Sequence, residues 1–398
     1  MLLACGDCGT IQRSPDGRAG FGLRCCRCDG TLARRNPNGR DTALALSLAT
    51  LFLLFPANLL TLLHFSVAGI DRSSRLGSGV AWMWAEGWPL LAVIVALQAV
   101  VLPFLRFGLL SAVLLTLRFG RGAPPNWTGP AFRWAERLDV WAMVDVFLIG
   151  AGIGYGRVAS RMPVEIGPGG WALIAVAFLT LLTRASLDRR AIWQAIGTPS
   201  PGGAGDIACQ ECQLVLPRSA AGRPCPRCRA RVHPRRPGSL TVATALVGAG
   251  YLLYLPANWL PLSVNVQFGQ EQTHTIIRGV QELVSAGFWP IGLIVFTASI
   301  GIPLLKLIGL TWLIWSARHG STRRLVLRTR LYRGIAEIGR WSNVDVYTIA
   351  VFLPLMQFQS IVAVRAAAGA PAFLAVVVLT MFAARAFDPR LMWDAARS

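Results

Sequence analysis

The sequence predicts an all-α polytopic membrane protein with two tandem four-helix transmembrane modules, each preceded by a small cysteine-rich β ribbon. Three observations support this fold class. Hydrophobic residues make up 54% of the 398 residues and charged residues only 15%, whereas soluble domains are about 25% charged. Eight apolar segments are long enough to cross a bilayer. A cysteine quartet precedes each set of four segments.

The eight predicted spans follow one another along the chain. A transmembrane helix needs about 20 apolar residues, and such segments lie at 42–63, 88–117, 138–156, 171–187, 240–262, 288–316, 343–364 and 371–387. Pro103 and Pro303 lie inside the second and sixth segments, so we expect a kink or a tilt there. The predicted domains are a first ribbon at 1–41, a first module at 42–193, a linker with the second ribbon at 194–239, and a second module at 240–398.

The distribution of basic residues predicts the orientation of the spans. Of the 39 lysines and arginines, 31 lie in 1–41, 118–137, 184–239, the connection between the sixth and seventh spans, and the C-terminal tail. Because positive residues stay on the cytoplasmic side, both termini and both ribbons are expected in the cytoplasm. The net charge of +20 then follows from topology, and no nucleic-acid partner is needed to explain it.

An internal repeat with an offset of 200 residues relates the two halves. "FPANLL" aligns with "LPANWL", and the basic Arg106 aligns with Lys306. Asp145 aligns with Asp345 in the same register. Because each half has an even number of spans, the repeats are parallel, and the inverted-repeat form of alternating access is not predicted.

The cysteine quartets predict two metal sites. The ligands are Cys5, Cys8, Cys25 and Cys28 in the first quartet and Cys209, Cys212, Cys225 and Cys228 in the second. Four thiolates at this spacing converge tetrahedrally on one ion, so we predict two structural zinc ribbons, with Gly9 and Gly30 supplying tight turns. Iron is the chemical alternative, and a cytoplasmic location argues against disulfides. For the ninth cysteine, Cys26, we expect a buried side chain rather than a substitute ligand or a reactive thiol.

Ionisable residues inside the spans are functional candidates, because their burial in a membrane is costly. The predicted network in the second half comprises Lys306, Asp345, Ser299, Ser342 and Thr380. Lysine changes its pKa readily when buried, so a Lys306–Asp345 pair with hydroxyl neighbours would form a proton relay. The alternative is that these groups only hold helices together. For Arg106 and Asp145 in the first half we predict a structural ion pair.

The "PAN" sequences mark the far end of the first span in each module. Pro56 and Pro256 remove a backbone donor and open a carbonyl one turn earlier. Asn58 and Asn258 are expected to bridge helices there or to bond the freed backbone. The simpler interpretation is a helix kink with a packing asparagine, and the other is a bent gate at the periplasmic mouth.

Together, these motifs resemble the paraquat-inducible protein A family (PqiA and its relative LetA). The resemblance covers nearly the whole chain and rests on the paired cysteine modules, "FPANLL", "LPANWLP", "WAMVDVF", "WSNVDVY" and "FDPRLMW". The first half departs from it, since "SLDRRAIW" replaces the last motif and Cys26 is extra. The resemblance implies a bacterial inner-membrane protein with two zinc ribbons and tetraspanin-like modules. It also implies an MCE-domain periplasmic partner in lipid trafficking between membranes.

The predicted function is therefore to load or extract phospholipid at the inner membrane, with coupling through the Lys306 network. No ATP-binding motif and no catalytic constellation is evident in the sequence, so an enzyme is not predicted. The alternative is a zinc- or redox-sensing membrane anchor in the envelope stress response, in which the spans only hold a partner.

Overall fold

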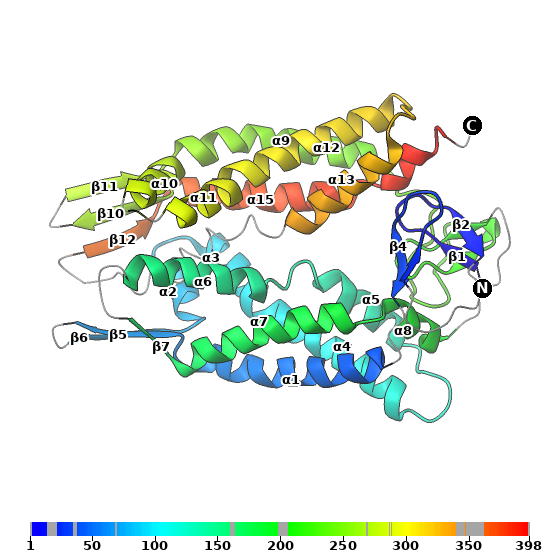
Figure 1. Cartoon of the computed structure of the whole chain (residues 1–398), viewed down its shortest axis with the longest axis horizontal. Helices are drawn as coiled ribbons and strands as arrows, with labels where there is room; N and C mark the ends of the chain where they lie inside the picture. Colours follow the sequence, from blue (N-terminus) through cyan, green and yellow to red (C-terminus); the bar gives the residue numbers. More distant parts are fainter. Residues whose placement is uncertain are drawn as a thin grey trace.

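The computed structural model places two helical modules side by side, with both ribbons at one end of the molecule (Figure 1). It describes residues 2–13, 22–34, 38–67, 70–159, 164–197, 206–267, 270–285, 287, 289–339, 347 and 362–396. We call the end that holds the cysteines the ribbon end. The opposite end holds two three-stranded sheets and is called the sheet end.

The two ribbons consist of short strands. Ribbon 1 contains β1 (Leu2–Ala4), β2 (Ile11–Arg13), β3 (Gly22–Arg24) and β4 (Thr31–Arg34), which form two antiparallel pairs. Ribbon 2 contains the antiparallel pair β8 (Ile207–Ala208) and β9 (Val215–Leu216), followed by the 3-10 turn η2 (Arg218–Ala220). The predicted small β hairpins are therefore present in both ribbons.

Module 1 runs from α1 to α8. Its elements are α1 (Gly39–Leu59), β5 (Leu63–Val67), β6 (Ile70–Ser74), α2 (Ser78–Ala85), α3 (Pro89–Ala96), η1 (Leu97–Val101), α4 (Leu102–Phe119), α5 (Thr128–Leu138), α6 (Val144–Ala159), β7 (Val164–Ile166), α7 (Pro168–Ser186) and α8 (Arg189–Ile196). The strands form an antiparallel sheet in the order β6-β5-β7.

The described elements of module 2 follow the same order, and the residues equivalent to α6 lie mostly outside the described part of the chain. Its elements are α9 (Ser239–Trp259), β10 (Ser263–Gln267), β11 (Gln270–His274), α10 (Ile276–Ser285), α11 (Trp289–Phe296), η3 (Thr297–Gly301), α12 (Ile302–Arg318), α13 (Leu325–Ile338), β12 (Val362–Ala366), α15 (Gly369–Ala386) and η5 (Pro389–Trp393). Its sheet has the order β11-β10-β12, which matches the sheet of module 1. The duplication seen in the sequence is thus a duplication of the fold.

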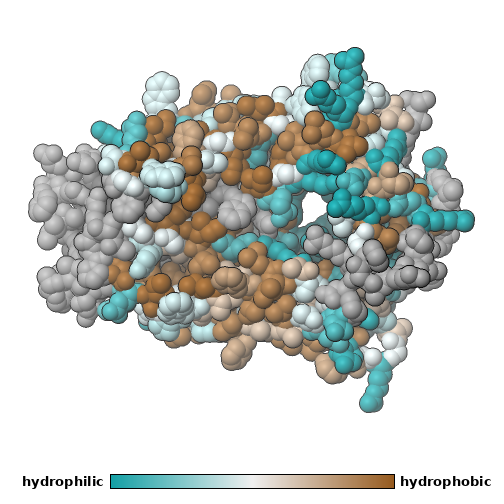
Figure 2. Space-filling model, in the orientation of Figure 1, coloured by the Kyte–Doolittle hydropathy of each residue, from teal (hydrophilic) through white to brown (hydrophobic). Residues whose placement is uncertain are grey.

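Six helices in the described part of the chain are long and apolar enough to cross a membrane, so the protein is a multi-pass membrane protein. They are Gly39–Leu59, Pro89–Phe119, Pro168–Ser186, Ser239–Trp259, Gly292–Arg318 and Gly369–Ala386. Helix α6 adds a shorter apolar stretch, Val144–Gly156. The predicted third span began at residue 138, but this helix begins at Val144. The predicted seventh span, 343–364, lies almost entirely outside the described residues. Figure 2 shows hydrophobic side chains over the middle of the visible face and hydrophilic ones toward the ribbon end.

A π-helical turn interrupts the long second helix of each module. Residues Leu97–Val101 and Thr297–Gly301 form these turns, and Pro103 and Pro303 follow two residues later. Proline cannot donate a backbone hydrogen bond, and a wider π turn relieves the broken ladder. The disturbance that we expected from these prolines therefore takes the form of a π turn in both modules.

The two modules share one cluster of buried hydrophobic residues, and several side chains make specific contacts between them. The hydroxyl of Tyr347 donates to Oε1 of Gln98 at 2.9 Å. The ring of Tyr347 also lies 5.4 Å from that of Phe147, measured between centroids. Nearer the ribbon end, Nη2 of Arg385 donates to the carbonyl of Arg137 at 3.2 Å. Aromatic and polar contacts thus join the modules at mid-depth and near the ribbons.

Each ribbon packs on the module that does not follow it in the chain. Ribbon 1 precedes α1, yet its buried cysteines share a hydrophobic cluster with residues of α9, α12, α13 and η5 in module 2. The cysteines of ribbon 2, which precedes α9, share a cluster with residues of α1, α4, α5 and α8 in module 1. Strand β1 also lies beside β9, so the ribbons touch each other. The ribbons are therefore crossed over the two modules.

Candidate metal centres and buried polar groups

All four Cys-x-x-Cys turns have the same backbone geometry. In the first turn, the amide of Gly9 donates to the carbonyl of Cys5 at 3.0 Å, and the amide of Cys5 donates to Thr10 at 2.9 Å. The same two bonds close the turns that begin at Cys25, Cys209 and Cys225. The residues after the second cysteine are left-handed: Gly9 has φ 69°, and Asp29, Gln213 and Arg229 each have φ 57°. The local backbone therefore aims both sulfurs of each pair at one point.

The glycines of ribbon 1 have two different roles. Gly9 supplies the left-handed turn, as its predicted role requires. Gly30 instead lies against the guanidinium of Arg333, which occupies the place where a Cβ would be. Because this contact comes from module 2, it could not be predicted from the local sequence of the turn.

The sulfur atoms of each quartet fit one tetrahedral ion. Within each quartet all four atoms lie within 4.8 Å of one another. Cys5 and Cys28 are 3.5 Å apart, and Cys209 and Cys228 are 3.6 Å apart. A tetrahedron with metal–sulfur bonds of about 2.3 Å has edges of about 3.8 Å. All eight side chains are buried, so these are two buried four-cysteine clusters with the geometry to hold a metal ion.

The electrostatics of the quartets favour a cation. Hydrogen bonds among the crowded sulfurs, together with burial, raise the pKa of Cys5 and Cys212 well above the usual range of a thiol. The same bonds lower the pKa of the sulfurs that accept them, Cys8 and Cys225. Four thiolates cannot share such a space unless a positive ion compensates them. Binding of a metal would replace the protons and remove this repulsion.

The ninth cysteine differs from our expectation. We expected a buried side chain for Cys26, but it is exposed. Its Sγ donates to Oε1 of Gln12 at 3.0 Å, and its backbone amide donates to the same oxygen at 3.2 Å. The reason is its place in the turn: the flanking Cys25 and Cys28 point inward, so Cys26 faces outward.

In module 1 a buried cation is compensated by a network of charges near the ribbon end. Arg106 is 2% exposed, and its Nη2 lies 2.5 Å from Oδ1 of Asp139. Nε of Arg184 lies 2.8 Å from the same oxygen, and Nη1 of Arg184 lies 2.7 Å from Oδ2 of Asp145. Arg189 extends the group to Glu136 at 2.9 Å. Three guanidinium groups and three carboxylates thus balance one another.

The predicted Arg106–Asp145 pair is therefore corrected. The carboxylate that the structure gives Arg106 is Asp139, and Asp145 is bound by Arg184. The reason is the position of α6, which begins only at Val144 and leaves Asp139 in a turn that faces α4. Asp139 lay inside a predicted span, and an acidic residue there was a signal that could have identified it.

In module 2 the equivalent cation has a different environment. Lys306 is also 2% exposed, and its Nζ donates to the carbonyl of Gly339 at 3.4 Å. With the offset of 200 residues, Gly339 takes the place of Asp139, and Ala384 takes the place of Arg184. Among the described residues the module 2 site therefore lacks both of these counterparts.

The other members of the predicted network are only partly described. Ser299 lies in the π turn η3 and donates to the carbonyl of Val295 at 2.7 Å. Thr380 is fully buried in α15 and donates to Val377 at 2.9 Å. Asp345 and Ser342 lie outside the described residues. The structure thus places three of the five residues in buried positions of module 2.

The two "PAN" sequences lie at the ends of α1 and α9, at the sheet end. Both helices continue past the proline for three residues. Nδ2 of Asn58 donates to the carbonyl of Leu54 at 2.7 Å, and Nδ2 of Asn258 donates to Tyr254 at 2.9 Å. Each asparagine therefore bonds its own helix one turn back, at a carbonyl two residues after the one that the proline frees.

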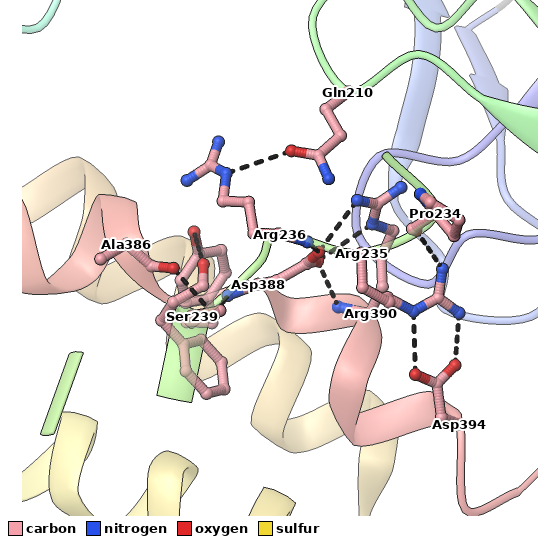
Figure 3. Close-up of polar contacts among 11 residues, drawn as sticks. Gln210, Pro234, Arg235, Arg236, Ser239, Ala386, Asp388, Arg390 and Asp394 are labelled. Carbon is pink, nitrogen blue, oxygen red and sulfur yellow. Dashed lines mark hydrogen bonds and ion pairs between the residues drawn. The ribbon is translucent and has the colours of Figure 1, made fainter. Parts of the chain in front are cut away.

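The linker from ribbon 2 to α9 is bound by the C-terminal turn of module 2 (Figure 3). Oδ2 of Asp388 accepts from the amide of Arg236 at 3.0 Å and lies 2.9 Å from Nη2 of Arg390. The amide of Asp388 donates to Oγ of Ser239 at 2.7 Å. An ion pair between Arg235 and Asp394 closes the other side. The start of module 2 is thus fixed to its own end.

Comparison with known protein families matches residues 41–197 and 240–397 to the family described as Paraquat-inducible protein A. The two matched regions correspond to the two modules. An Intermembrane transport protein PqiA of Escherichia coli (strain K12) is 32% identical over 408 residues, covering 98% of this chain and 95% of the relative. The Lipophilic envelope-spanning tunnel protein A of the same strain is 30% identical over 401 residues, covering 99% and 91%. A Probable intermembrane transport protein of Haemophilus influenzae is 25% identical, covering 98% and 95%. No solved structure matches the chain.

Proposed function

Because the chain belongs to the paraquat-inducible protein A family, we propose that it is the inner-membrane component of a system that moves phospholipid between membranes. The names of two full-length relatives, an intermembrane transport protein and an envelope-spanning tunnel protein, support a transport role. An MCE-domain periplasmic protein is the proposed partner, with which this chain loads or extracts lipid.

The proposed topology has eight spans, with both termini and both ribbons in the cytoplasm. Six described helices, the shorter α6 and the segment 343–364 supply these spans. The excess of arginine at the ribbon end supports this orientation, since positive residues stay on the cytoplasmic side. In this orientation the two sheets face the periplasmic partner.

The proposed metal is zinc in both quartets, with iron as the chemical alternative. Sulfur-only tetrahedral sites suit both metals, and the role is structural because the four positions of each site are closed by protein ligands. Elemental analysis of the purified protein is expected to give two zinc ions per chain. Serine substitutions in one quartet should remove one ion, and a content of iron instead would overturn the assignment to zinc.

The observation that carries the transport mechanism is the difference between the two buried cations. Arg106 is balanced by Asp139 and its neighbours, whereas Lys306 donates to a carbonyl at the place where the acidic partner would be. A lysine in such a site can gain and lose a proton, which an arginine cannot do. We assign Lys306, Asp345, Ser299, Ser342 and Thr380 to a network that couples protonation to lipid movement.

Complementation of a strain that lacks the transporter tests this assignment. Lys306→Ala and Asp345→Ala are each expected to abolish complementation while the amount of protein in the membrane stays at the wild-type level. The matched control is Arg318→Ala, which removes an exposed charge from the end of the same helix and should complement fully. Full complementation by the Lys306 and Asp345 variants would show that the network is not required.

One observation favours a second candidate, a redox- or zinc-sensing anchor. The exposed thiol of Cys26 lies next to the quartet residue Cys25, where oxidation would alter the first site. In that case Cys26→Ser should abolish a stress response and leave lipid transport intact. Loss of transport in the Lys306 variant, with a normal stress response in the Cys26 variant, would favour the transporter.

A further inference from the structure

The two ribbons dock on the opposite modules through the same kinds of residue, an acidic side chain of the ribbon and arginines of a helix. Asp7 and Glu211 are the acidic residues between the first two cysteines of their quartets. Each forms an ion pair with an arginine of the other module's ribbon-end helix, α13 for ribbon 1 and α5 for ribbon 2. The arginines at the equivalent positions 133 and 333 each also bond the last cysteine of a quartet, Arg133 its backbone carbonyl and Arg333 its Sγ. The two docking contacts are therefore similar in kind, although Glu211 is bound by Arg137 and Asp7 by Arg333 itself.

Arg333 of α13 makes two contacts with ribbon 1. Nε of this arginine lies 2.7 Å from Oδ2 of Asp7 and its Nη2 donates to Sγ of Cys28 at 3.3 Å. Gly30 leaves the space that the guanidinium occupies. On the neighbouring surface, Arg27 stacks on the ring of Trp393 at 5.0 Å from its centroid. One guanidinium thus joins α13 to the acidic residue and to a sulfur of the site.

Ribbon 2 is bound to module 1 by two arginines one helical turn apart. Arg137 makes a two-pronged contact with Glu211, at 2.7 Å and 3.2 Å. Nη1 of Arg133 donates to the carbonyl of Cys228 at 2.9 Å. Gly129 at the start of α5 has no room for a Cβ, because the carbonyl of Arg227 lies against it. Backbone of the second site and backbone of α5 are therefore in close contact.

The chemistry of a four-cysteine site gives these contacts a dependence on metal. Four thiolates around one divalent cation carry a net charge of about −2, which a neighbouring guanidinium compensates. Small ribbons of this kind fold only when the metal is bound. Loss of one ion should therefore remove both the folded docking surface and the negative charge that the arginine meets.

We propose that each ribbon is a metal-dependent clamp on the opposite module, so that occupancy of the first site orders α13 and occupancy of the second orders α5. Arg333 in module 2, and Arg133 with Arg137 in module 1, are the positioning residues of the two clamps. The clamps cross: occupancy of the metal site in ribbon 1 affects module 2, and occupancy of the site in ribbon 2 affects module 1. This inference does not depend on what the protein transports.

Hydrogen exchange of the full chain in detergent micelles, analysed by mass spectrometry, tests the crossing. In Cys5→Ser/Cys8→Ser protein we expect peptides from Leu325–Ile338 to exchange roughly tenfold faster or more, because charged hydrogen bonds hold this helix. Peptides from Thr128–Leu138 should keep the wild-type rate. In Cys209→Ser/Cys212→Ser protein we expect the reverse: faster exchange in Thr128–Leu138 and the wild-type rate in Leu325–Ile338. Metal analysis must show one ion lost in each variant.

Three results would overturn the proposal. The first is faster exchange only in the module that directly follows the altered ribbon, which means α5 for the ribbon 1 variant and α13 for the ribbon 2 variant. Another is an equal response of both helices to either pair of substitutions. The third is an unchanged rate in both helices although one ion has been lost.

A second set of variants leaves the cysteines intact and keeps the test decisive if a cysteine variant fails to fold. Arg333→Gln should raise exchange in α13 while both metal ions are retained. Its matched control is Arg330→Gln, which breaks a contact with the half-exposed Asp29 at 3.2 Å and should change little, since exposed pairs contribute little. Adding Arg333→Gln to the Cys5→Ser/Cys8→Ser protein should give no further increase. Equal effects of the two arginine variants, or additive effects with the cysteine variant, would contradict the clamp.

Discussion

Arg106 and Lys306 occupy equivalent places in the two modules, yet their surroundings compensate the charge in different ways. Arg106 belongs to a group of three guanidinium groups and three carboxylates. Lys306 donates to the carbonyl of Gly339. A buried ion pair is costly to break because the remaining partner stays buried and uncompensated. Among the described residues, the partner of Lys306 is a neutral carbonyl, so its removal leaves no uncompensated charge there.

We expect Arg106→Gln to lower the free energy of unfolding by about 3 kcal/mol or more. Lys306→Gln should lower it by less than about 1.5 kcal/mol, the net contribution of an ordinary hydrogen bond. Unfolding by SDS titration in mixed micelles, followed by tryptophan fluorescence, would compare the two variants. An equally large loss for Lys306→Gln would contradict this expectation and would indicate a carboxylate partner such as Asp345, which lies outside the described residues.

The residues of the two four-cysteine clusters could be predicted, because paired Cys-x-x-Cys sequences at this spacing are typical of metal ligands. The ion pair of Arg106 was only half predictable. The repeat placed Arg106 opposite a carboxylate of the next span, but the choice between Asp139 and Asp145 depends on where α6 begins. That boundary is set by packing in three dimensions, and a hydropathy pattern locates it only to within several residues.

Among the described helices, the most extensive contacts join the first and last spans of each module. The chain leaving α1 runs against the start of α7, where the amide of Gly169 donates to the carbonyl of Thr61 at 2.9 Å. In module 2 the amide of Gly369 donates to Pro261 at 3.0 Å. These bonds lie directly beyond the "PAN" sequences. The residues after each "PAN" are therefore bound to the first turn of the last span.

Glycine is required at both of these positions. A Cβ on Gly369 would lie 2.6 Å from the carbonyl oxygen of Pro261, and one on Gly169 would lie 2.5 Å from that of Leu60. We expect Gly169→Ala and Gly369→Ala each to destabilise the protein by about 1–3 kcal/mol, as overpacking does. Thermal unfolding in detergent would measure the change.

The matched control is Gly108→Ala within α4, where a Cβ would meet no atom within 4 Å. Alanine is favoured over glycine in a helix by about 1 kcal/mol, so this variant should raise the unfolding temperature. A lowered temperature for Gly108→Ala, or no effect of Gly169→Ala, would mean that the close contacts do not determine the packing.

The helices of the membrane region were largely predictable, whereas the strands at the sheet end were not. Long apolar stretches identify spans from composition alone. Strands such as β7 are three residues long and pair with β5 from a distant part of the chain. The local pattern of apolar and polar residues does not predict such a pairing, because the hydrogen-bonding partner is set by the folding of the whole module.

At the ribbon end of the molecule, Asp388 joins the C-terminal turn of module 2 to the residues that lead into α9. Burial acts to raise the pKa of this carboxyl, but hydrogen bonds and charge from Arg390, with the amide of Arg236, hold it below the ordinary value of 3.8. Tyr332 of α13 faces the same group, and burial raises its pKa to about 12, so it stays neutral in acid. The charged form of Asp388 is therefore the form that stabilises the folded state.

This stabilisation should be complete above about pH 4 and should be lost as the pH falls from there through the lowered pKa of Asp388. We expect the unfolding temperature of the wild type to fall in this window more steeply than that of Asp388→Asn. The measurement is thermal unfolding in detergent from pH 6 to pH 3. Parallel curves for the two proteins would contradict a role of the charged carboxylate.

The crossing of the ribbons could not be predicted from the sequence. Both the repeat and the order of the chain indicate that each ribbon belongs to the module that follows it. The contacts that decide otherwise join distant residues: Arg333 and Asp7 are 326 positions apart, and Arg137 and Glu211 are 74 apart. Their charges alone do not distinguish them from the other arginines of the ribbon end.

The crossing also has a consequence for how the chain is made. Ribbon 1 leaves the ribosome first, but α13, on which it docks, is synthesised about 300 residues later. At about 5–20 residues per second, the first ribbon waits roughly 15–60 s for its partner surface. During this interval ribbon 1 lacks the surface on which it docks, so a metal ion held by its four cysteines would be what keeps it folded until the second half is inserted.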